Sequence, residues 1–464
     1  MNLGEAHFRG RRVTVVGLAR SGFAACKVLA GLGANVLATD QTPIEGLRVD
    51  AAELLRMGVR LEAGGHSARS FLEADLIVVS PGVDSRLPFL AQARLQGVPV
   101  WGEVELAYQL AVAPFIGITG TKGKGTVATL LGAMLAQAGR KTIVAGNIGR
   151  PLCDVVGSLA EDTWIVAELS SFQLEEVVQF HPRIAVLLNL APDHLDRYPN
   201  VETYYAAKKR LFGQQTHEDV AVLNKDDAQV LALAEGVRAR RVYFSRQLPV
   251  GIGASLQQGW VCVESTRGVR RICAVGELPA SGPGILEDAL AASAAANILD
   301  IEPERMAEAL RGFPGRAHCL EKVAEIGGVR YVNDSKATNV FAVRRALEAI
   351  EAPIILIAGG RDKREDFRSL AALVRERVKA LFVIGEARPK ILAQIGDCCP
   401  SEEAGSMADA VERASRLAVP GDVVLMSPGC ASFDMFQNAE QRGEMFTSVV
   451  RALQARRESV GHGR

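Results

Sequence analysis

The sequence has 464 residues, which is too many for a single hydrophobic core, so we expect about two to four domains. Lys and Arg together number 53, as do Asp and Glu, so no net charge favours nucleic acid or an anionic membrane as a partner, and any anion site must be local. No run approaches the ~18 apolar residues of a membrane span, the N-terminal MNLGEAHFRGRR lacks the apolar segment of a signal peptide, and the scattered cysteines form no C-x-x-C pair, so we expect a cytoplasmic protein with reduced thiols.

The first predicted element is a short strand, Arg12–Val16, which leads into the glycine-containing loop Gly17–Gly22. A helix and a second strand, Asn35–Thr39, follow, and the second strand ends at Asp40. A β-α-β unit with an acidic residue at the tip of its second strand is an arrangement used to bind nucleotides. Ala19 occupies the middle glycine position of the G-x-G-x-x-G pattern, and its Cβ would hinder the approach of a pyrophosphate. We therefore expect a different nucleotide, or none, in place of a dinucleotide.

A third strand of this domain is predicted over Ala74–Val79 and ends in Ser80-Pro81-Gly82. The helix Leu87–Gln96 and the strand Pro99–Trp101 complete a small parallel sheet. Polar and glycine residues just past the carboxyl end of a strand lie where open α/β sheets bind ligands.

The second domain contains the stretch Gly117–Thr126, GITGTKGKGT, between an apolar strand and an apolar-periodic helix. Glycine backbone N–H groups, the positive end of the helix and the charge of Lys124 together favour a bound phosphate. The strict pattern G-x-x-x-x-G-K-[ST] is not met, because Ile118 replaces the first glycine and Gly125 follows the lysine. A glycine-rich turn without a ligand therefore remains an alternative interpretation.

Further polar residues of this domain follow predicted strands. Asn147 follows the strand Lys141–Ala145, Glu168 follows Trp164–Ala167, and His194 lies in the loop after Ile184–Leu190. A carboxylate at a strand end beside a phosphate loop suits a nucleotide-bound Mg²⁺ ion, although Glu168 as a helix cap and His194 as a structural histidine are alternatives. The run Lys208-Lys209-Arg210 on a predicted helix is of a kind that ordinarily forms a solvated face.

The third part of the chain repeats the pattern of strands that end in polar loops. Val329–Val332 is followed by Asn333–Asn339, and Pro353–Ala358 is followed by Gly359–Lys363. Two further strands end in Gly385-Glu386 and Ser427-Pro428-Gly429. Four such strand ends predict another doubly wound sheet with a cleft at its strand tips.

Seven motifs in this order resemble those of the Mur ligase family: GITGTKGKGT, AELSSFQL, APDHLDRY, YYAAKK, NDSKATN, AGGRDK and SPGCASFDMFQNAEQRG. Within the family, NDSKATN and the N-terminal GLARSG are similar to the members that add D-glutamate. The resemblance covers all three domains and implies an α/β fold. It implies an N-terminal Rossmann-like domain that binds the UDP substrate, a central P-loop ATPase-like domain that binds ATP, and a C-terminal Rossmann-like domain that binds the amino acid, with boundaries at residues 1–112, 113–314 and 315–464.

For the reaction, the resemblance implies an ATP-dependent ligase of peptidoglycan precursor synthesis. ATP phosphorylates the carboxylate of UDP-N-acetylmuramoyl-L-alanine (UDP-MurNAc-L-Ala), the amine of D-glutamate attacks the acyl phosphate, and phosphate leaves. The resemblance also implies that the enzyme uses two Mg²⁺ ions as cofactors. We expect a monomer that binds these small molecules and neither nucleic acid nor membrane.

The resemblance also assigns roles to individual residues. Lys124 would contact the phosphates. Glu168, His194, Lys208 and Thr126 would bind the metal ions, with Lys208 at the position where the family carries a carbamylated lysine. The implied catalytic set is Lys124, Glu168, His194 and Lys208. The implied ATP contacts are Gly120, Thr121, Lys122, Gly123, Lys124, Gly125, Thr126, Asn147 and His318. The implied substrate contacts are Ser21, Asp40 and Gln41 for uridine, Ser80, Pro81 and Gly82 for the sugar-diphosphate side, and Lys336, Thr338, Lys363, Ser432 and Phe433 for D-glutamate. Two lysine cations suit an acceptor with two carboxylates.

The chain departs from the family pattern at several positions. The phosphate loop usually reads GTNGK followed by Ser or Thr, whereas here Lys122 replaces Asn and Gly125 replaces the hydroxyl residue that would contact Mg²⁺. Cys319 follows His318 where the family tends to have His-Arg, and Ala439 replaces a bulkier residue. The alternatives are therefore a sister ligase that adds another amino acid, against which NDSKATN and GLARSG argue, and a nucleotide-binding protein with a decayed ATPase site.

Overall fold

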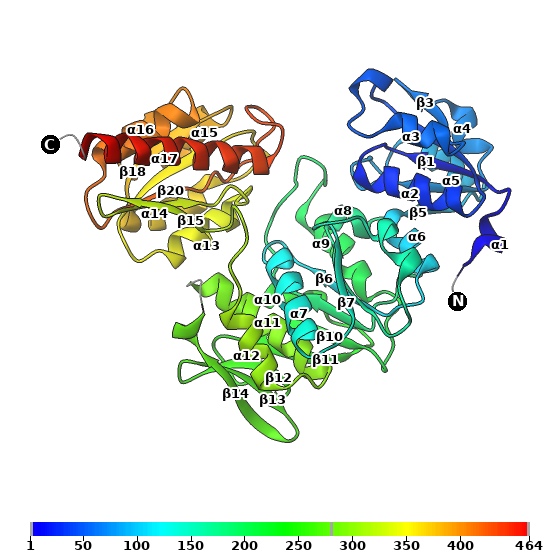
Figure 1. Ribbon diagram of the computed structural model, residues 1–464, viewed down its shortest axis with the longest axis horizontal. Helices are drawn as coiled ribbons and strands as arrows, with labels where there is room; N and C mark the ends of the chain where they lie inside the picture. The colour runs from blue at the N-terminus through cyan, green and yellow to red at the C-terminus, as the bar shows by residue number, and fades with distance from the viewer. Residues whose placement is uncertain (1–2, 279–281, 462–464) are drawn as a thin grey trace. The chain divides into compact units, whose positions relative to one another are not determined.

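Three β-sheets with helices on their faces make up the computed structural model, which describes residues 3–278 and 282–461 (Figure 1). The chain divides into two compact units. Unit 1 comprises Met1–Leu190, Tyr205–Val275 and Asp288–Arg311, and unit 2 comprises Ala191–Tyr204, Gly276–Glu287 and Gly312–Arg464. Unit 1 contains the first two sheets and unit 2 contains the third. The predicted fold class, α/β with three sheet-containing parts, is confirmed.

The N-terminal sheet has five parallel strands in the order β3-β2-β1-β4-β5. The order reverses between β1 and β4, and such a switch point is where open α/β sheets bind ligands. Its strands are β1 (Arg12–Val16), β2 (Asn35–Asp40), β3 (Arg60–Ala63), β4 (Leu76–Val79) and β5 (Val100–Gly102). Its helices are α1 (Glu5–Phe8), α2 (Arg20–Gly31), α3 (Ala51–Arg56), α4 (Ala68–Leu72), α5 (Pro88–Leu95) and α6 (Glu103–Leu110).

The second sheet of unit 1 has nine strands in the order β14-β13-β12-β11-β10-β9-β6-β8-β7. Pairing is parallel from β7 to β12, and β12, β13 and β14 pair antiparallel. Its strands are β6 (Phe115–Thr119), β7 (Thr142–Gly146), β8 (Trp164–Glu168), β9 (Ile184–Leu187), β10 (Val220–Asn224), β11 (Arg240–Ser245), β12 (Gly253–Gln257), β13 (Trp260–Ser265) and β14 (Gly268–Ala274). The helices of this part of the chain are α7 (Lys124–Gln137), α8 (Ser171–Leu174), α9 (Val201–Lys209), α10 (Ala228–Leu233), α11 (Pro283–Ile298) and α12 (Pro303–Arg311). The starts of α9 and α11, up to Tyr204 and Glu287, belong to unit 2. Every residue of β6 and β9 is buried, as expected for central strands covered on both faces.

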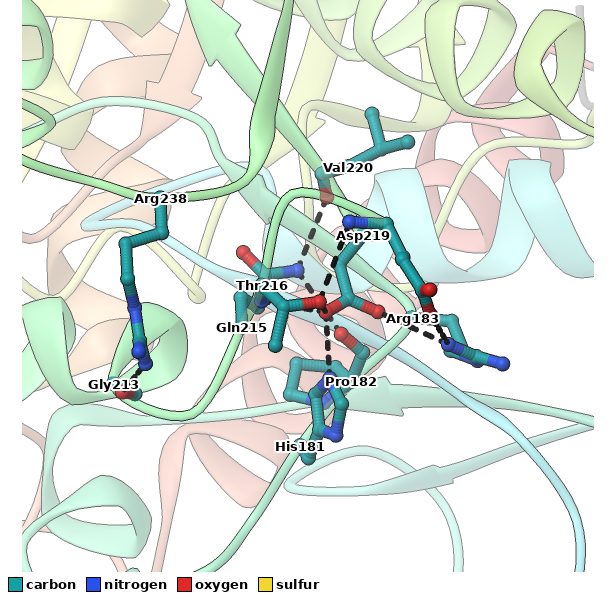
Figure 2. A network of polar contacts seen from close by, with 10 residues as sticks. His181, Pro182, Arg183, Gly213, Gln215, Thr216, Asp219, Val220 and Arg238 are labelled. Carbon is teal, nitrogen blue, oxygen red and sulfur yellow. Dashed lines mark hydrogen bonds and ion pairs between the residues drawn. The ribbon is translucent and has the colours of Figure 1, made fainter.

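A polar network fixes the starts of β9 and β10 at the sheet edge opposite the phosphate loop (Figure 2). The buried carboxylate of Asp219 accepts hydrogen bonds from Thr216 N at 2.7 Å and His181 Nε2 at 2.6 Å. Burial opposes ionisation of Asp219, but the Thr216 and His181 hydrogen bonds outweigh it and lower the pKa of this carboxyl. Gln215 Nε2 donates to the carbonyl oxygens of Pro182 and Val220, which ties together the segments that precede the two strands.

The sheet of unit 2 has six strands in the order β15-β16-β20-β17-β18-β19, and only the β15 and β16 pair is antiparallel within it. Its strands are β15 (Glu321–Ile326), β16 (Val329–Asn333), β17 (Ile354–Gly359), β18 (Val378–Ile384), β19 (Ser401–Glu403) and β20 (Val423–Met426). Its helices are α13 (Val340–Ala349), α14 (Ala371–Arg377), α15 (Arg388–Ile395), α16 (Met407–Leu417) and α17 (Ala439–Gly461). One apolar core joins the sheet to α13, α14 and α15, and a second joins it to α16 and α17, so helices cover both faces.

None of the helices within residues 3–278 and 282–461 is both long enough and apolar enough to cross a membrane.

Candidate functional site

The phosphate-loop stretch predicted from the sequence connects β6 to α7. Gly120 and Gly123 have φ of 153° and 87°, values that favour glycine, and Gly123 is the N-cap of α7. A side chain at Gly120 would also come within 2.9 Å of Leu188 Cβ. The backbone therefore takes the glycine-dependent path of a loop that can surround an anion at a helix N-terminus.

Asn189 braces this loop from the end of β9. Its Oδ1 accepts from Lys122 N at 2.8 Å, its Nδ2 donates to Lys122 O at 3.0 Å, and its carbonyl accepts from Thr121 N at 3.0 Å. Asn189 had no predicted role, because its partner Lys122 is 67 residues away in the chain. The available signal was an asparagine at the end of the apolar run Ile184–Leu190.

Two lysine ammonium groups meet at one carbonyl oxygen of the loop. Lys124 Nζ donates to Gly120 O at 3.0 Å and to Thr121 O at 3.1 Å. Lys208 Nζ, from α9, donates to the same Gly120 oxygen at 2.9 Å, and Lys208 is only 1% exposed. Two cations this close repel each other, and a bound anion or the loss of one positive charge would relieve that repulsion.

Glu168, at the end of β8, is buried and lies beside Asn147. Asn147 Nδ2 donates to Glu168 Oε1 at 2.8 Å, and Asn147 N donates to Glu168 O at 2.9 Å. The next helix, α8, is capped by Ser170 in a capping box with Gln173, so Glu168 is not the residue that caps it.

Asp288, in α11, packs its carboxylate against Gly123. A Cβ on Gly123 would overlap Asp288 Oδ1, and Asp288 is buried. No pattern in the sequence connected Asp288 with the phosphate loop. Gly125 and Thr126 lie in the first turn of α7, and Thr129 Oγ1 donates to Gly125 O at 2.8 Å.

His194 belongs to unit 2, whereas Glu168 and Lys208 belong to unit 1. His194 has φ of 57°, and its backbone N donates to Asp193 Oδ1 at 2.8 Å. Within the described part of the chain, no three His, Cys, Asp or Glu side chains form a group that could hold a metal ion. The oxygen chemistry of Glu168 nevertheless fits Mg²⁺, which prefers one or two carboxylates together with substrate phosphates to a cage made only of protein ligands.

The predicted uridine-side residues lie at the carboxyl ends of β1, β2 and β4. Asp40 Oδ2 accepts from Leu18 N at 2.6 Å and Oδ1 accepts from Thr42 N at 2.7 Å. Burial opposes ionisation of Asp40, but the hydrogen bonds from Leu18 and Thr42, together with nearby His66, outweigh it and lower the pKa of the carboxyl. Ser21 is the second residue of α2, and Gln41, which follows Asp40, is exposed.

Ser80 directly follows β4 and lies at the same carboxyl edge of the sheet as Asp40. Its hydroxyl donates to Gly17 O at 2.7 Å, and a Cβ on Gly22 would overlap that same Gly17 oxygen. The Gly17–Gly22 loop therefore packs tightly against Ser80, with Pro81 and Gly82 next in the chain. These loops flank the switch point between β1 and β4.

The predicted amino-acid site gathers the loops after β16, β17 and β20, which are adjacent parallel strands. Lys336 forms an ion pair with Glu440, and Lys363 forms one with Asp193. Thr338 is half-buried, Ser432 is buried and Phe433 is exposed. His318, for which the resemblance implied an ATP contact, also lies in unit 2, where its Nδ1 is 2.9 Å from Asn333 Nδ2.

Arg442, in α17, holds two of these loops together. It is fully buried, and its guanidinium donates to Ser335 Oγ at 3.0 Å, Ser335 O at 2.8 Å and Cys430 O at 3.0 Å. Burial lowers the pKa of Arg442 to about 10. Arg442 lies within the last of the seven motifs but had no predicted role, because its partner Ser335 is 107 residues away in the chain.

Family models match three successive parts of the chain. The model for the Mur ligase MurD-like, N-terminal domain matches residues 11–102, that for the Mur ligase middle domain matches 118–296, and that for the Mur ligase, glutamate ligase domain matches 315–430. The chain is also 44% identical over 446 residues to the UDP-N-acetylmuramoylalanine--D-glutamate ligase of Acidobacterium capsulatum, covering 96% of this chain and 97% of that protein.

Solved structures share the fold at low sequence identity. A pseudomurein peptide ligase type C from Methanothermus fervidus matches with a TM-score of 0.61 at 16% identity, covering 96% of this chain and 100% of that one. A MurF ligase from Thermotoga maritima in complex with ADP matches with a TM-score of 0.58 at 14% identity, covering 97% of each chain. At these identities the likeness concerns the fold alone.

Proposed function

This chain belongs to the Mur ligase family, and from that premise we propose that it joins D-glutamate to UDP-MurNAc-L-Ala at the expense of ATP, as a step of peptidoglycan precursor synthesis. The observation that carries the ATP half of the proposal is the glycine loop on which Lys124 and Lys208 converge. The acceptor and donor are proposed from the name of the 44% identical relative.

The reaction is an acyl transfer in two steps. A carboxylate oxygen of UDP-MurNAc-L-Ala attacks the γ-phosphorus of ATP, which forms an acyl phosphate and releases ADP. The amine of D-glutamate then attacks the acyl carbon, the C–O bond to phosphate breaks, and the amine loses a proton. Both anionic partners of the first step repel each other, so cations must neutralise charge where they meet.

We assign the charge-neutralising work to side chains near the phosphate loop. Lys124 would bind the phosphates together with the backbone from Gly120 to Gly123, and Asn189 keeps that loop in place. Mg²⁺, when bound, supplies Lewis-acid stabilisation of the transferring phosphoryl group. Glu168 and His194 are the proposed Mg²⁺ ligands, and Asn147 orients Glu168. Thr126 is a further proposed ligand, because it is the first hydroxyl residue after Lys124 in the sequence.

We further propose that Lys208 carries a carbamate. A carbamate would convert one of two adjacent cations into an anion, which removes their repulsion and adds a hard oxygen ligand for a metal ion. Burial of Lys208, in contrast to exposed Lys209, supports modification at this position of the run. We also propose a monomer that works in the cytoplasm; the eight free cysteines support the reducing compartment.

The substrate sites are proposed on the two remaining sheets. Ser21, Asp40, Gln41, Ser80, Pro81 and Gly82 would bind the UDP part, and Lys336, Thr338, Lys363, Ser432 and Phe433 would bind D-glutamate. Their place at the carboxyl ends of parallel strands supports this, because ligands of open α/β sheets bind there.

Phosphate release with UDP-MurNAc-L-Ala, ATP and Mg²⁺ tests the proposal when D-glutamate, L-glutamate, meso-diaminopimelate and L-lysine are offered in turn. We expect release with D-glutamate only. Release with another amino acid instead would identify a sister ligase, and no release with any acceptor would leave the chain as a nucleotide-binding protein without ligase activity.

A further inference from the structure

Both lysines proposed to bind D-glutamate already pair with carboxylates of the chain itself. Lys363 Nζ lies 2.5 Å from Asp193 Oδ1, and Lys336 pairs with Glu440 of α17. D-glutamate brings two further carboxylates, so each internal pair must either open or accept the ligand as an additional partner.

The two pairs differ in burial. The side chains of Lys336 and Glu440 are 35% and 51% exposed, whereas those of Lys363 and Asp193 are 8% and 5% exposed. Ion pairs in contact with water contribute little and exchange partners readily, but removing one member of a buried pair leaves a costly uncompensated charge. The Glu440 pair can therefore open for a ligand, and the Asp193 pair stays closed.

Further hydrogen bonds hold Asp193 in place. Asn339 Nδ2 donates to Asp193 Oδ2, and His194 N donates to Asp193 Oδ1 at 2.8 Å. The orientation of Asn339 is itself fixed, because its Oδ1 caps α13 by accepting from Ala342 N at 2.9 Å. Displacing Asp193 would break all of these contacts at once.

The segment that carries Asp193 also carries His194. Residues Ala191–Tyr204 belong to unit 2, although β9 and β10 on either side of the segment belong to the second sheet of unit 1. The contacts of Asp193 with Asn339 and Lys363 join this segment to the loops after β16 and β17. The Asp193 carboxylate therefore holds both this segment and Lys363 in place.

We propose that Asp193 is a positioning residue of the amino-acid site, which holds Lys363 in the orientation that binds a carboxylate of the acceptor. The proposal rests on the proposed function, since it takes Lys363 as an acceptor contact. An ammonium group has three hydrogens, so Lys363 keeps donors for the ligand while one is given to Asp193. The acceptor carboxylate adds to the buried pair and does not replace Asp193.

The Asp193→Asn variant tests this, because it keeps the size of the side chain and removes its charge. We expect kcat/KM for D-glutamate to fall about ten-fold or more, mainly through KM, while KM for ATP stays within about two-fold. The matched control is Glu202→Gln, an exposed carboxylate of the same segment for which the structure shows no polar partner among the described residues; it should change neither value.

A double-mutant cycle separates positioning from general damage. If Asp193 acts through Lys363, the Asp193→Asn change should alter kcat/KM for D-glutamate by less than about two-fold in a Lys363→Gln background. Equal losses in both backgrounds would overturn the proposal. So would tighter D-glutamate binding in Asp193→Asn, which would mean that Asp193 competes with the acceptor.

A second variant covers the case in which Asp193→Asn does not fold. Asn339→Ser keeps a residue that caps helices and removes the donor to Asp193, so we expect kcat/KM for D-glutamate to fall about three-fold with an unchanged melting temperature. An unchanged kcat/KM would contradict the proposal. Should the parent enzyme use an amino acid other than D-glutamate, the proposed acceptor is wrong, and the same comparison with that amino acid still tests Asp193.

Discussion

Lys208 and Lys209 are neighbours in α9, yet their side chains have opposite environments. Lys208 is buried and contacts the phosphate loop, whereas Lys209 is exposed and its Nζ lies 3.4 Å from Glu235 O. Neighbouring positions on a helix differ by about 100° in direction, so one member of a charged run can serve a site while the next faces solvent. The predicted solvated face therefore holds for Lys209 and not for Lys208.

At this scale we predict that Lys208→Ala lowers kcat about 100-fold or more, while Lys209→Ala stays within about two-fold of the parent. The cause is the loss of a buried group at the phosphate loop, which Lys209 does not contact. Steady-state phosphate release measures the rates. Equal activity of the two variants would refute the assignment.

The carbamate has its own readout. After equilibration with ¹³C-bicarbonate, a carbamate ¹³C signal is expected in the parent and in Lys209→Ala and should be missing from Lys208→Ala. Its presence in Lys208→Ala would place the modification elsewhere or show that the signal is nonspecific.

At the scale of elements, α17 connects two loops of the predicted amino-acid site through Arg442. The helix buries Phe446, Val450 and Leu453 against the sheet of unit 2, at the i, i+4 and i+7 spacing of an apolar helix face. That packing places Arg442 where its guanidinium can bridge Ser335 and Cys430. The helix thus positions the site without contributing a residue to the predicted contacts.

We predict that Arg442→Met lowers the free energy of unfolding by about 3 kcal/mol, because it leaves buried carbonyl and hydroxyl groups without their donor. Arg451→Met is the control: Arg451 is an exposed residue of the same helix and should change stability by less than about 0.5 kcal/mol. Urea unfolding followed by circular dichroism measures both. A small effect of Arg442→Met would show that the loops do not depend on this bridge.

A second element-scale prediction concerns Glu103 at the start of α6. Its Oε1 accepts from Cys153 N at 2.8 Å, and its Oε2 has no partner among the described residues. Burial raises the pKa of Glu103 to about 7, although the Cys153 hydrogen bond opposes the shift. The ordinary pKa of a glutamate side chain is 4.5. Between pH 4.5 and about 7 the folded chain therefore retains a proton that the unfolded chain releases, so stability falls as pH rises through this window.

Glu103→Gln keeps the neutral form and should remove that loss. We expect the variant and the parent to have the same free energy of unfolding at pH 4.5. At pH 8 the free energy of unfolding of the variant should be higher by about 3 kcal/mol, from 1.36 kcal/mol per pKa unit. Urea midpoints at the two pH values measure the difference. An identical pH dependence in both proteins would show that Glu103 is ionised in the folded state.

At the scale of the whole molecule, each of the three sheets carries the proposed contacts for a different ligand. The predicted UDP contacts follow strands of the first sheet, the phosphate loop follows β6 of the second, and the amino-acid contacts follow strands of the third. A substitution in one set of loops should therefore change the binding of one ligand and leave the others.

We predict that Asp40→Asn raises KM for UDP-MurNAc-L-Ala about ten-fold, because it removes the charge that orders the Leu18 and Thr42 backbone, and leaves KM for ATP and D-glutamate within about two-fold. Asp50→Asn, which can still cap α3, should change none of the three. Initial rates with each substrate varied in turn give these values. A parallel rise in all three would argue against separate sites.

The fold class and the glycine-rich loops could be predicted because they depend on neighbouring residues. Apolar strands that end in Gly, Ser, Lys or Asp show the carboxyl edge of each sheet, and glycine positions show where backbone with positive φ is needed. Strand β3, Arg60–Ala63, escaped prediction because four partly polar residues carry too short a pattern. Helix α17 also escaped, although its apolar spacing was readable.

The sequence by itself determined that glycine, lysine and other polar residues follow the ends of the strands, since a strand and the loop that follows it are continuous in the chain. Only the tertiary structure decided which side chains meet there. Asn189 is 67 residues from Lys122, Ser335 is 107 from Arg442, and Asp193 is 170 from Lys363. Such pairs depend on the order of strands within each sheet and on how segments pack, which short-range patterns do not encode.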